Sequence, residues 1–201
     1  MCQVTDWEKA LDFHGHACPG LAVGYRAALA ALRELGANRS PDEQLVAIVE
    51  NDACGVDAIQ VLTGCTFGKG NLVFRDYGKH VYTIGRRDNG KAVRVSVKRS
   101  WSQSEEYKAL REKVFSGNAT EEERKAFARM QQDNTERILE APEEEILDIK
   151  HIPLELPRKA RIFKSVECAV CGETVMEPRA RLHNGQAVCI PCSEEYRCVK
   201  L

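Results

Sequence analysis

Apolar residues in the first part of the chain recur at helical spacing and predict two helices. The first is expected over residues 6–15, where Thr5 and Glu8 form the pattern of a capping box. The second is expected over residues 19–36, with Cys18 as its capping residue. Its Ala- and Leu-rich stripe predicts a face buried against a core.

The next part of the chain carries strand signals. Residues 45–50 form a continuous apolar, β-branched run, which is typical of a buried strand. An Asn-Gly pair at residues 89–90 separates two β-rich runs and predicts a hairpin. The remaining elements expected here are a short helical turn at 40–43, a helix at 55–64, a strand at 71–78, and hairpin strands at 80–87 and 91–98.

These strands do not alternate regularly with helices, so the pattern predicts an α+β fold with helices packed on a small mixed sheet of three or four strands. Two further helices are expected between residues 104 and 140, a short one from Pro142, and an extended linker at 151–159. We expect three parts: an α+β core at 1–100, a helical connector with linker at 101–157, and a small tail domain at 158–201.

Composition narrows the class of protein. The chain has 201 residues, of which 43% are hydrophobic, and a formal net charge of −1. A globally basic nucleic-acid binder and a disordered acidic chain are both disfavoured. The sequence shows no signal peptide and no apolar run of membrane-spanning length, so we expect a cytoplasmic protein without membrane contact. The charge is uneven, because residues 102–150 hold 8 basic and 13 acidic side chains.

The nine cysteines carry the strongest chemical signal. Two C-x-x-C pairs, Cys168 with Cys171 and Cys189 with Cys192, are 17 residues apart. Such pairs supply the four thiolates of a tetrahedral zinc site. An Asn-Gly hairpin between the pairs and a helix from about residue 193 predict a treble-clef or ribbon zinc finger. The alternative is two redox dithiols or disulfides.

That zinc is expected to be structural, because about 40 residues are too few to bury a core without a metal or a cross-link. Cys2 and Cys198 have no assigned role. A small buried residue or a surface thiol is the favoured interpretation of Cys198.

A second candidate site lies in the core. His14, His16 and Cys18 alternate with small residues, so an extended segment would place all three side chains on one side. Imidazole and thiolate together suit zinc, iron, nickel or copper. Cys18 and Cys54 are each expected at a helix N-terminus, which favours the thiolate form. We expect them to share a metal with His16 first and His14 second.

Several neighbouring residues have weaker signals. Asp57 lies one turn into its helix, where it could orient a ligand histidine. Cys65 is expected about 16 Å from Cys54, too far to share one ion, and is a secondary candidate beside Lys69 in a substrate pocket. The glycine-rich loop at 63–71 lacks the spacing of a P-loop. The alternative is that the histidines bond to backbone groups and the cysteines fill the core.

The acidic helices carry an apolar stripe, which predicts a homodimer, since an exposed stripe of this kind is a liability. The alternative is that the stripe packs on the protein's own core. Its members are Leu110, Val114, Phe127, Met130, Ile138 and Leu139.

Three motifs, at residues 14–27, 50–72 and 76–79, resemble the FmdE family of formylmethanofuran dehydrogenase proteins. The cysteine-rich tail resembles the zinc finger found in some members. The resemblance implies an α+β core, metal binding and anaerobic one-carbon metabolism around formyl groups and carbon dioxide. The implied site is His14, His16, Cys18, Cys54 and Cys65, with Asp57 and Lys69 nearby.

Two functions follow from these observations. The first is a metal-binding protein of this family, either an accessory subunit of a molybdenum or tungsten complex or an enzyme acting on a small one-carbon substrate. It would hold a structural zinc and a second metal in the core, with zinc, iron and nickel as candidates. The second is a zinc-finger regulator or interaction module that binds nucleic acid or protein through its basic tail. With only Phe163 and Tyr196 as aromatic residues in that tail, nucleic acid is disfavoured.

Overall fold

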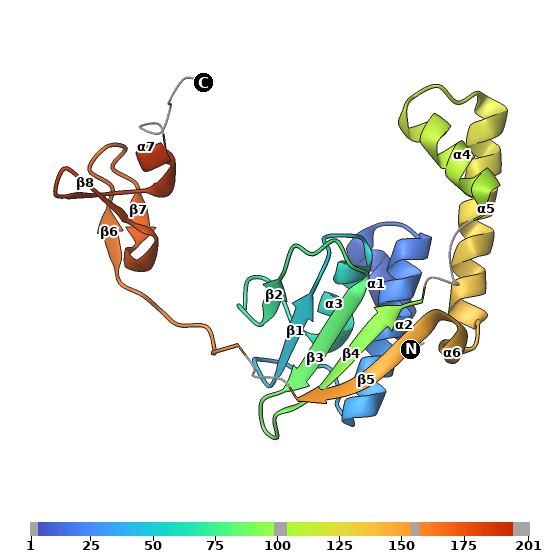
Figure 1. The fold of residues 1–201 in the computed structure, drawn as a ribbon, viewed down its shortest axis with the longest axis horizontal. Helices are drawn as coiled ribbons and strands as arrows, with labels where there is room; N and C mark the ends of the chain where they lie inside the picture. Colours follow the sequence, from blue (N-terminus) through green and yellow to red (C-terminus); the bar gives the residue numbers. More distant parts are fainter. Residues whose placement is uncertain (1–3, 99–103, 154–156, 195–201) are drawn as a thin grey trace. The chain divides into compact units, whose positions relative to one another are not determined.

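The computed structural model describes residues 4–98, 104–153 and 157–194 (Figure 1). Cys2, Tyr196 and Cys198 lie outside the described residues. The chain forms two compact units, residues 1–159 and 160–201. Each unit is described by itself.

The first unit is built on a five-stranded mixed sheet in the order β2-β1-β3-β4-β5. The strands are β1 (Leu45–Val49), β2 (Leu72–Phe74), β3 (Val81–Arg86), β4 (Lys91–Val97) and β5 (Leu147–Pro153). The β1–β2 pair is parallel and all the others are antiparallel. Every residue of β1 is buried, as its apolar run predicts. The predicted α+β class is confirmed.

Three helices lie together on one face of this sheet: α1 (Asp6–His14), α2 (Pro19–Leu35) and α3 (Gly55–Thr63) (Figure 1). Thr5 and Glu8 form the predicted capping box of α1, and Gly15 ends that helix in the left-handed conformation with φ 88°. The Ala-rich face of α2 is buried in the main core.

Helices α2 and α3 pack through glycines. A Cβ atom placed on Gly24 of α2 would lie 2.2 Å from the carbonyl oxygen of Gly55, the first residue of α3. A Cβ atom placed on Gly20 would lie 3.3 Å from Cβ of Cys54. The two backbones therefore approach closely because side chains are absent there, and this brings the N-termini of the two helices together.

The acidic part of the chain forms α4 (Glu105–Phe115), α5 (Glu121–Glu140) and the short α6 (Glu143–Ile146). The guanidinium of Arg26 on α2 donates to the carbonyl oxygens of Ile138 at 2.7 Å, Leu139 at 2.8 Å and Ala141 at 2.9 Å. These carbonyls lie at the C-terminal end of α5, where no intrahelical N–H is left to bond them. Arg26 therefore holds the C-terminal end of α5 against α2.

The sheet has five strands, not the expected three or four, and two local predictions are also wrong. Residues 147–153, of which 151–153 were expected in the linker, form β5, so the connector contributes an edge strand to the core sheet and belongs to the first unit. Proline is tolerated there because Pro153 ends an edge strand. Residues 41–44 form a bend and turn, not a helical turn, because Ser40 Oγ bonds to the Gln44 side chain and to the carbonyl oxygen of Asp42.

The second unit contains two small hairpins and a short helix. The first hairpin is β6 (Ser165–Glu167) with β7 (Thr174–Met176), and the second is β8 (Arg181–His183) with β9 (Gln186–Val188). A 3₁₀ turn, Glu177–Arg179, lies between them. Asn184 (φ 49°) and Gly185 (φ 78°) make the predicted Asn-Gly turn. The helix α7 (Ile190–Glu194) begins a few residues earlier than expected, so it includes Cys192.

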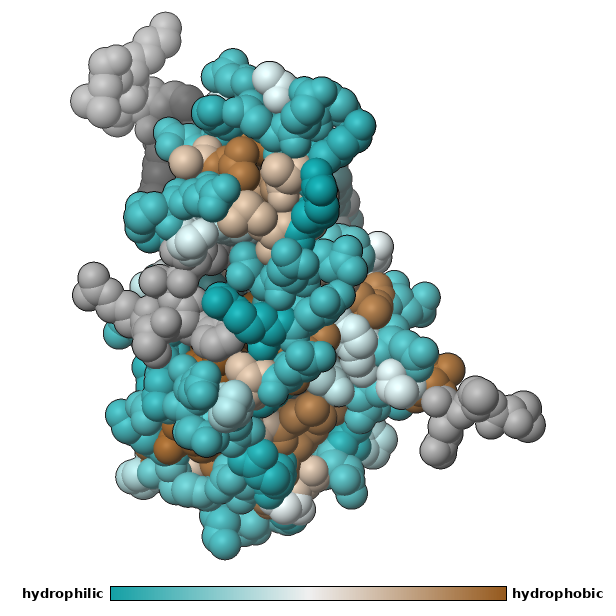
Figure 2. Space-filling model, turned by 90° about the vertical axis from the view of Figure 1, so that its right-hand side faces the viewer, coloured by the Kyte–Doolittle hydropathy of each residue, from teal (hydrophilic) through white to brown (hydrophobic). Residues whose placement is uncertain are grey.

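The apolar stripe of the connector is largely covered within the chain. Phe127 and Ile138 are buried, and the Phe127 ring packs on Tyr107 with centroids 5.2 Å apart. On the face shown in Figure 2, hydrophobic residues form small patches separated by hydrophilic ones. Phe115, which lies beside the stripe at the end of α4, is 74% exposed. Among the helices that the structure describes, none has the length and apolar character needed to cross a bilayer.

Candidate metal centres

The four cysteines of the tail come together around one point. Cys168 follows β6, Cys189 follows β9 and Cys192 lies in α7. Together with Cys171 their sulfurs all lie within 4.8 Å of one another, and Sγ of Cys171 is 3.9 Å from Sγ of Cys189. Neighbouring sulfurs of a tetrahedral site with Zn–S bonds of about 2.3 Å are about 3.8 Å apart. The arrangement therefore fits structural zinc.

Backbone groups around this cluster favour thiolate at one position. The backbone N–H groups of Cys171 and Cys189 point at Sγ of Cys168 and lower the pKa of that thiol to about 6. The N–H of Cys189 lies 3.2 Å from this sulfur. Gly172 follows the first pair in the left-handed conformation (φ 74°) and its N–H bonds to the carbonyl oxygen of Cys168. This closes the tight turn that presents two sulfurs together.

The core cluster forms where α1 ends and α2 begins. One ring nitrogen each from His14 and His16 and the sulfur of Cys18 lie within 4.8 Å of one another. The alternation of His14, His16 and Cys18 with small residues predicted an extended segment. In the structure this segment is not extended over its whole length. His14 is the last residue of α1, and Gly15 turns the chain so that the two imidazole rings lie 4.6 Å apart.

Hydrogen bonds hold His14 in one orientation. Its Nδ1 lies 2.7 Å from Oδ2 of Asp57, in the first turn of α3, and its Nε2 lies 3.8 Å from Sγ of Cys18. With Nδ1–H donated to the carboxylate, Nε2 presents its lone pair toward the sulfur. The sequence analysis predicted His16 as the first histidine ligand and His14 as the second. The structure favours His14, which is half-buried and held by Asp57, whereas His16 is exposed.

The donor set of the core fits a transition metal. In a tetrahedral zinc site, a ligand nitrogen and a ligand sulfur are about 3.5 Å apart, close to the separation of His14 Nε2 from Cys18 Sγ. Three protein ligands would leave one position open, as in catalytic sites. An imidazole that is hydrogen-bonded to a carboxylate can also act as the base that activates a neighbouring cysteine thiol as a nucleophile. Cys18 is only 5% exposed, which disfavours that use.

The electrostatics of Cys18 differ from the sequence expectation. Burial raises the pKa of this thiol, the backbone N–H of Leu21 opposes that rise, and the neighbouring Cys54 thiol adds to it. Leu21 N–H lies 3.3 Å from the sulfur, so Cys18 caps α2 as predicted. The helix N-terminus does not outweigh burial, and metal binding would supply the positive charge that thiolate needs.

Cys54 lies beside Cys18 across the glycine contact. The position of a Cβ atom on Gly20 would be 3.7 Å from Sγ of Cys54 and 3.9 Å from Sγ of Cys18. Cys54 is not part of the 4.8 Å group with both histidines. A cleft of about 420 Å³ opens beside it, lined by His14, Asp57 and the rings of Phe67 and Phe74, among others.

Cys65 and Lys69 lie elsewhere. Cys65 is fully buried beyond the C-terminal end of α3, so this nine-residue helix, about 14 Å long, separates it from Cys54, and burial raises the pKa of its thiol. The ammonium of Lys69 donates to the carbonyl oxygen of Pro41 at 3.4 Å. Neither residue lines the 420 Å³ cleft. The structure therefore separates this pair from the His-Cys cluster.

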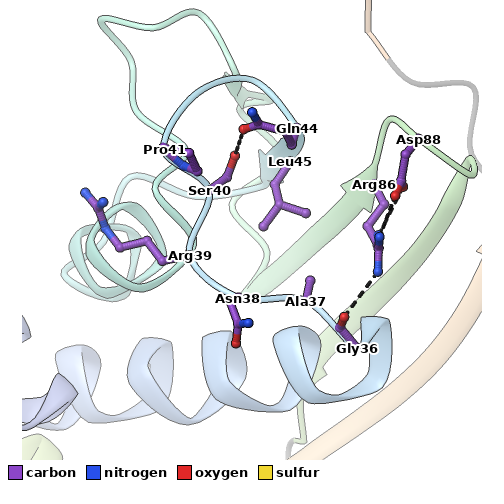
Figure 3. Close-up of a pocket in the computed structure, with 10 residues that line it drawn as sticks. All are labelled: Gly36, Ala37, Asn38, Arg39, Ser40, Pro41, Gln44, Leu45, Arg86 and Asp88. Carbon is purple, nitrogen blue, oxygen red and sulfur yellow. Dashed lines mark hydrogen bonds and ion pairs between the residues drawn. The ribbon is translucent and has the colours of Figure 1, made fainter.

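Another hollow, of about 290 Å³, lies at the opposite end of α2 (Figure 3). Its cation Arg86 pairs with Asp88 and donates to the carbonyl oxygens of Leu35 and Gly36 at 3.1 Å. These bonds cap the C-terminal end of α2. Arg86 therefore has a structural role in this hollow.

The aromatic lining of the 420 Å³ cleft was not predicted. Phe67 is 79% exposed and Phe74 46% exposed, so both rings face solvent at the cleft. Their signal in the sequence is a phenylalanine in a polar glycine-rich loop and another at the end of a short strand. Exposed aromatic rings next to ligating side chains are a feature of binding sites.

The fold and the two cysteine-containing clusters define a class: an α+β core with a His-Cys cluster, followed by a four-cysteine zinc finger. A family model described as FmdE, molybdenum formylmethanofuran dehydrogenase operon, matches residues 13–148. A second, described as prokaryotic dksA/traR C4-type zinc finger, matches residues 161–197. The chain belongs to the FmdE family, as its three motifs indicated.

Two individual proteins are similar to this chain. One, from Archaeoglobus fulgidus, is named a probable S-adenosyl-L-methionine-binding protein and is 33% identical over 95% of this chain and 53% of its own length. The chain thus spans about half the length of that relative. The other is a crystal structure of a tungsten formylmethanofuran dehydrogenase FmdE-like protein from Syntrophus aciditrophicus. It has a TM-score of 0.58 and 24% identity, with 96% of this chain and 92% of that chain covered. This likeness confirms the fold.

Proposed function

We propose that the core of this protein binds a transition metal through His14, His16 and Cys18. Cys54 lies beside this group, and Asp57 orients His14. The observation that carries the proposal is the convergence of three ligand atoms within 4.8 Å, one of them on an imidazole whose other nitrogen is bonded to a carboxylate. Zinc, iron and nickel all accept this mixture of nitrogen and sulfur ligands.

The position of this site supports a role in handling a small molecule. His14, which belongs to the cluster, and Asp57, which is hydrogen-bonded to His14, both line the 420 Å³ cleft. A metal with an open coordination position there would polarise an oxygen or sulfur atom of a bound substrate. Phe67 and Phe74 would supply apolar contact area for the remainder of that substrate.

The chemical context supports one-carbon metabolism. The family description refers to formylmethanofuran dehydrogenase, which concerns a formyl group. The Archaeoglobus relative is named for S-adenosyl-L-methionine, which carries a transferable methyl group. We propose that this chain acts on, or delivers, a one-carbon group, either as a stand-alone enzyme or as an accessory subunit of a molybdenum or tungsten complex.

Metal analysis of the full chain tests the core site. We expect two metal equivalents per chain, one in each cysteine-containing cluster. The double variant Cys18→Ser with Cys54→Ser is expected to lose one equivalent and to keep the tail zinc. Cys65→Ser is the matched control, because it removes a buried thiol outside the cluster and is expected to keep both. Full metal content in the double variant would contradict the proposal.

A second candidate function is an interaction module. The tail forms its own compact unit and matches a prokaryotic zinc-finger family. Residues 158–201 hold 8 basic and 5 acidic side chains, which favours an acidic partner, and the few aromatic residues of the tail favour a protein over nucleic acid. A single zinc per chain, located in the tail, would favour this function over the core metal site.

The homodimer is also a proposal. Phe115 on α4 is the large exposed apolar residue near the connector stripe, and it would lie in such an interface. Sedimentation at micromolar concentration distinguishes the two states, and a monomeric mass would exclude the dimer.

A further inference from the structure

A cleft of about 340 Å³ lies between α2, α4 and α5 and is lined by basic side chains. Lys108 and Arg111 belong to α4, and Arg137 belongs to α5. His80 directly precedes β3. No acidic side chain is among the described residues that line it. This is notable because the part of the chain that supplies α4 and α5 has more acidic than basic residues.

The cations differ in how far their contacts neutralise their positive charge. Lys108 is paired with Glu105 at 2.6 Å, so its charge is partly compensated. Arg111 lies over the Phe115 ring at 5.6 Å, which is an uncharged contact. Arg137 donates to Asn134 Oδ1 at 3.3 Å and has a further interaction besides, so like Lys108 it lines the cleft as a cation that already has partners. The described lining holds no carboxylate, so the polar side chains that an entering ligand would meet are cationic or neutral.

The floor of the cleft is apolar. Val23 of α2, Val97 of β4 and Ile138 of α5 line it. Val23 and Ile138 are both buried, so they are fixed parts of the core. A ligand that matches this cleft has an anionic group at one end and an apolar body at the other.

The N-terminus of α2 forms one wall. Pro19 and Gly20 line the cleft, and the partial positive charge of a 17-residue helix end adds to the cationic side chains. Gly20 also borders the cysteine pair, since its absent Cβ would point at Cys54 and Cys18. Gly20 therefore borders both the cleft and the two thiols.

We infer that this cleft binds a small organic molecule with a doubly charged anionic group, such as a phosphate monoester, on an apolar body. Two arginines favour such a group over a single carboxylate, because a guanidinium can donate two parallel hydrogen bonds to phosphate oxygens. The inference is independent of the metal in the core and does not require it.

Calorimetric titration of the full chain with phenyl phosphate at about 0.15 M ionic strength tests this inference. We expect phenyl phosphate to bind more tightly than inorganic phosphate, which lacks the apolar body, and than phenylacetate, which carries a single charge. Arg111→Gln and Arg137→Gln are each expected to weaken phenyl phosphate binding about tenfold.

Arg129→Gln is the matched control, because it removes an exposed arginine of α5 that does not line the cleft. It is expected to leave the affinity unchanged, and circular dichroism checks that all three variants are folded. The Cys18→Ser with Cys54→Ser variant is expected to bind phenyl phosphate normally. Absence of binding at millimolar concentration, equal binding of phenylacetate, or equal weakening by Arg129→Gln would each overturn the inference.

Discussion

Replacing Gly24 by alanine should separate the two helices that carry the core cysteines. The added Cβ would lie 2.2 Å from the carbonyl oxygen of Gly55 and 2.3 Å from its Cα, whereas ordinary contacts begin at 3.4 Å. Both atoms belong to the backbone, so no side chain can rotate away. The N-terminal end of α3 must therefore move by about 1 Å.

The energetic cost follows from two opposing effects. Overpacking of a well-packed interior costs about 1–3 kcal/mol, and contact between two backbones lies at the upper end because neither can adapt alone. Alanine in a helix interior recovers about 1 kcal/mol relative to glycine. We expect a net loss of about 2 kcal/mol, which lowers the melting temperature of a protein of this size by about 4–8 °C.

Gly20→Ala provides a graded comparison. Its added Cβ would lie 3.3 Å from Cβ of Cys54, so the neighbour has to shift by only a few tenths of an ångström. We expect a smaller loss than for Gly24→Ala. Gly68→Ala is the neutral control, because no atom lies within 4 Å of its added Cβ.

Thermal unfolding and metal titration of the three variants form the assay. We expect stability to fall in the order Gly68→Ala, Gly20→Ala, Gly24→Ala. Because a metal site tolerates only about 0.2 Å of displacement, Gly24→Ala should also weaken metal binding in the core if Cys54 is a ligand. A Gly24→Ala protein as stable as the wild type would refute the close contact between α2 and α3.

Three further predictions concern single contacts. Arg94→Met leaves the Glu50 carboxylate, 6% exposed, without its guanidinium partner, and should lower the free energy of unfolding in urea by about 2–3 kcal/mol; a change below about 0.5 kcal/mol would contradict this. Cys171→Ser should abolish hydrogen-exchange protection in residues 165–194 while the first unit keeps its protection, because the tail has little core besides its zinc site. Asp57→Asn removes the carboxylate that orients His14 and should lower core metal affinity about 10- to 100-fold in a competition titration; an unchanged affinity would exclude an orienting role.

Local signals in the sequence predicted most of the elements. The capping box before α1, the apolar run of β1 and the Asn-Gly turns are each encoded within about ten residues, and the structure contains all of them. The edge strand β5 was missed because its pairing partner, β4, lies about 50 residues away in the sequence. Such pairing depends on tertiary contacts that the local pattern does not contain.

The candidate sites likewise combine features that the local sequence encodes with features that depend on tertiary contacts. The tail cysteines are two short motifs, so their spacing alone indicated a shared metal. In the core, the residue types, the helix-capping role of Cys18 and an orienting role of Asp57 for a histidine were predicted. The sequence did not predict that this histidine is His14, because the contact joins residues 43 positions apart. The end of α1 and the start of α2, not an extended segment, bring the candidate ligands together, and that geometry depends on the left-handed turn at Gly15.

The glycines of α2 connect the fold to the proposed chemistry. Side chains at Gly20 and Gly24 would hold α3 away, and Cys54 with Asp57, both near the N-terminal end of α3, would move with it. Asp57 would then lose its 2.7 Å contact with His14, and the imidazole would be free to rotate away from Cys18. The packing that stabilises the core and the orientation of the candidate ligands therefore depend on the same helix contact. A variant that loosens this contact should lose metal affinity before it loses secondary structure, because ligand geometry tolerates smaller displacements than helix packing does.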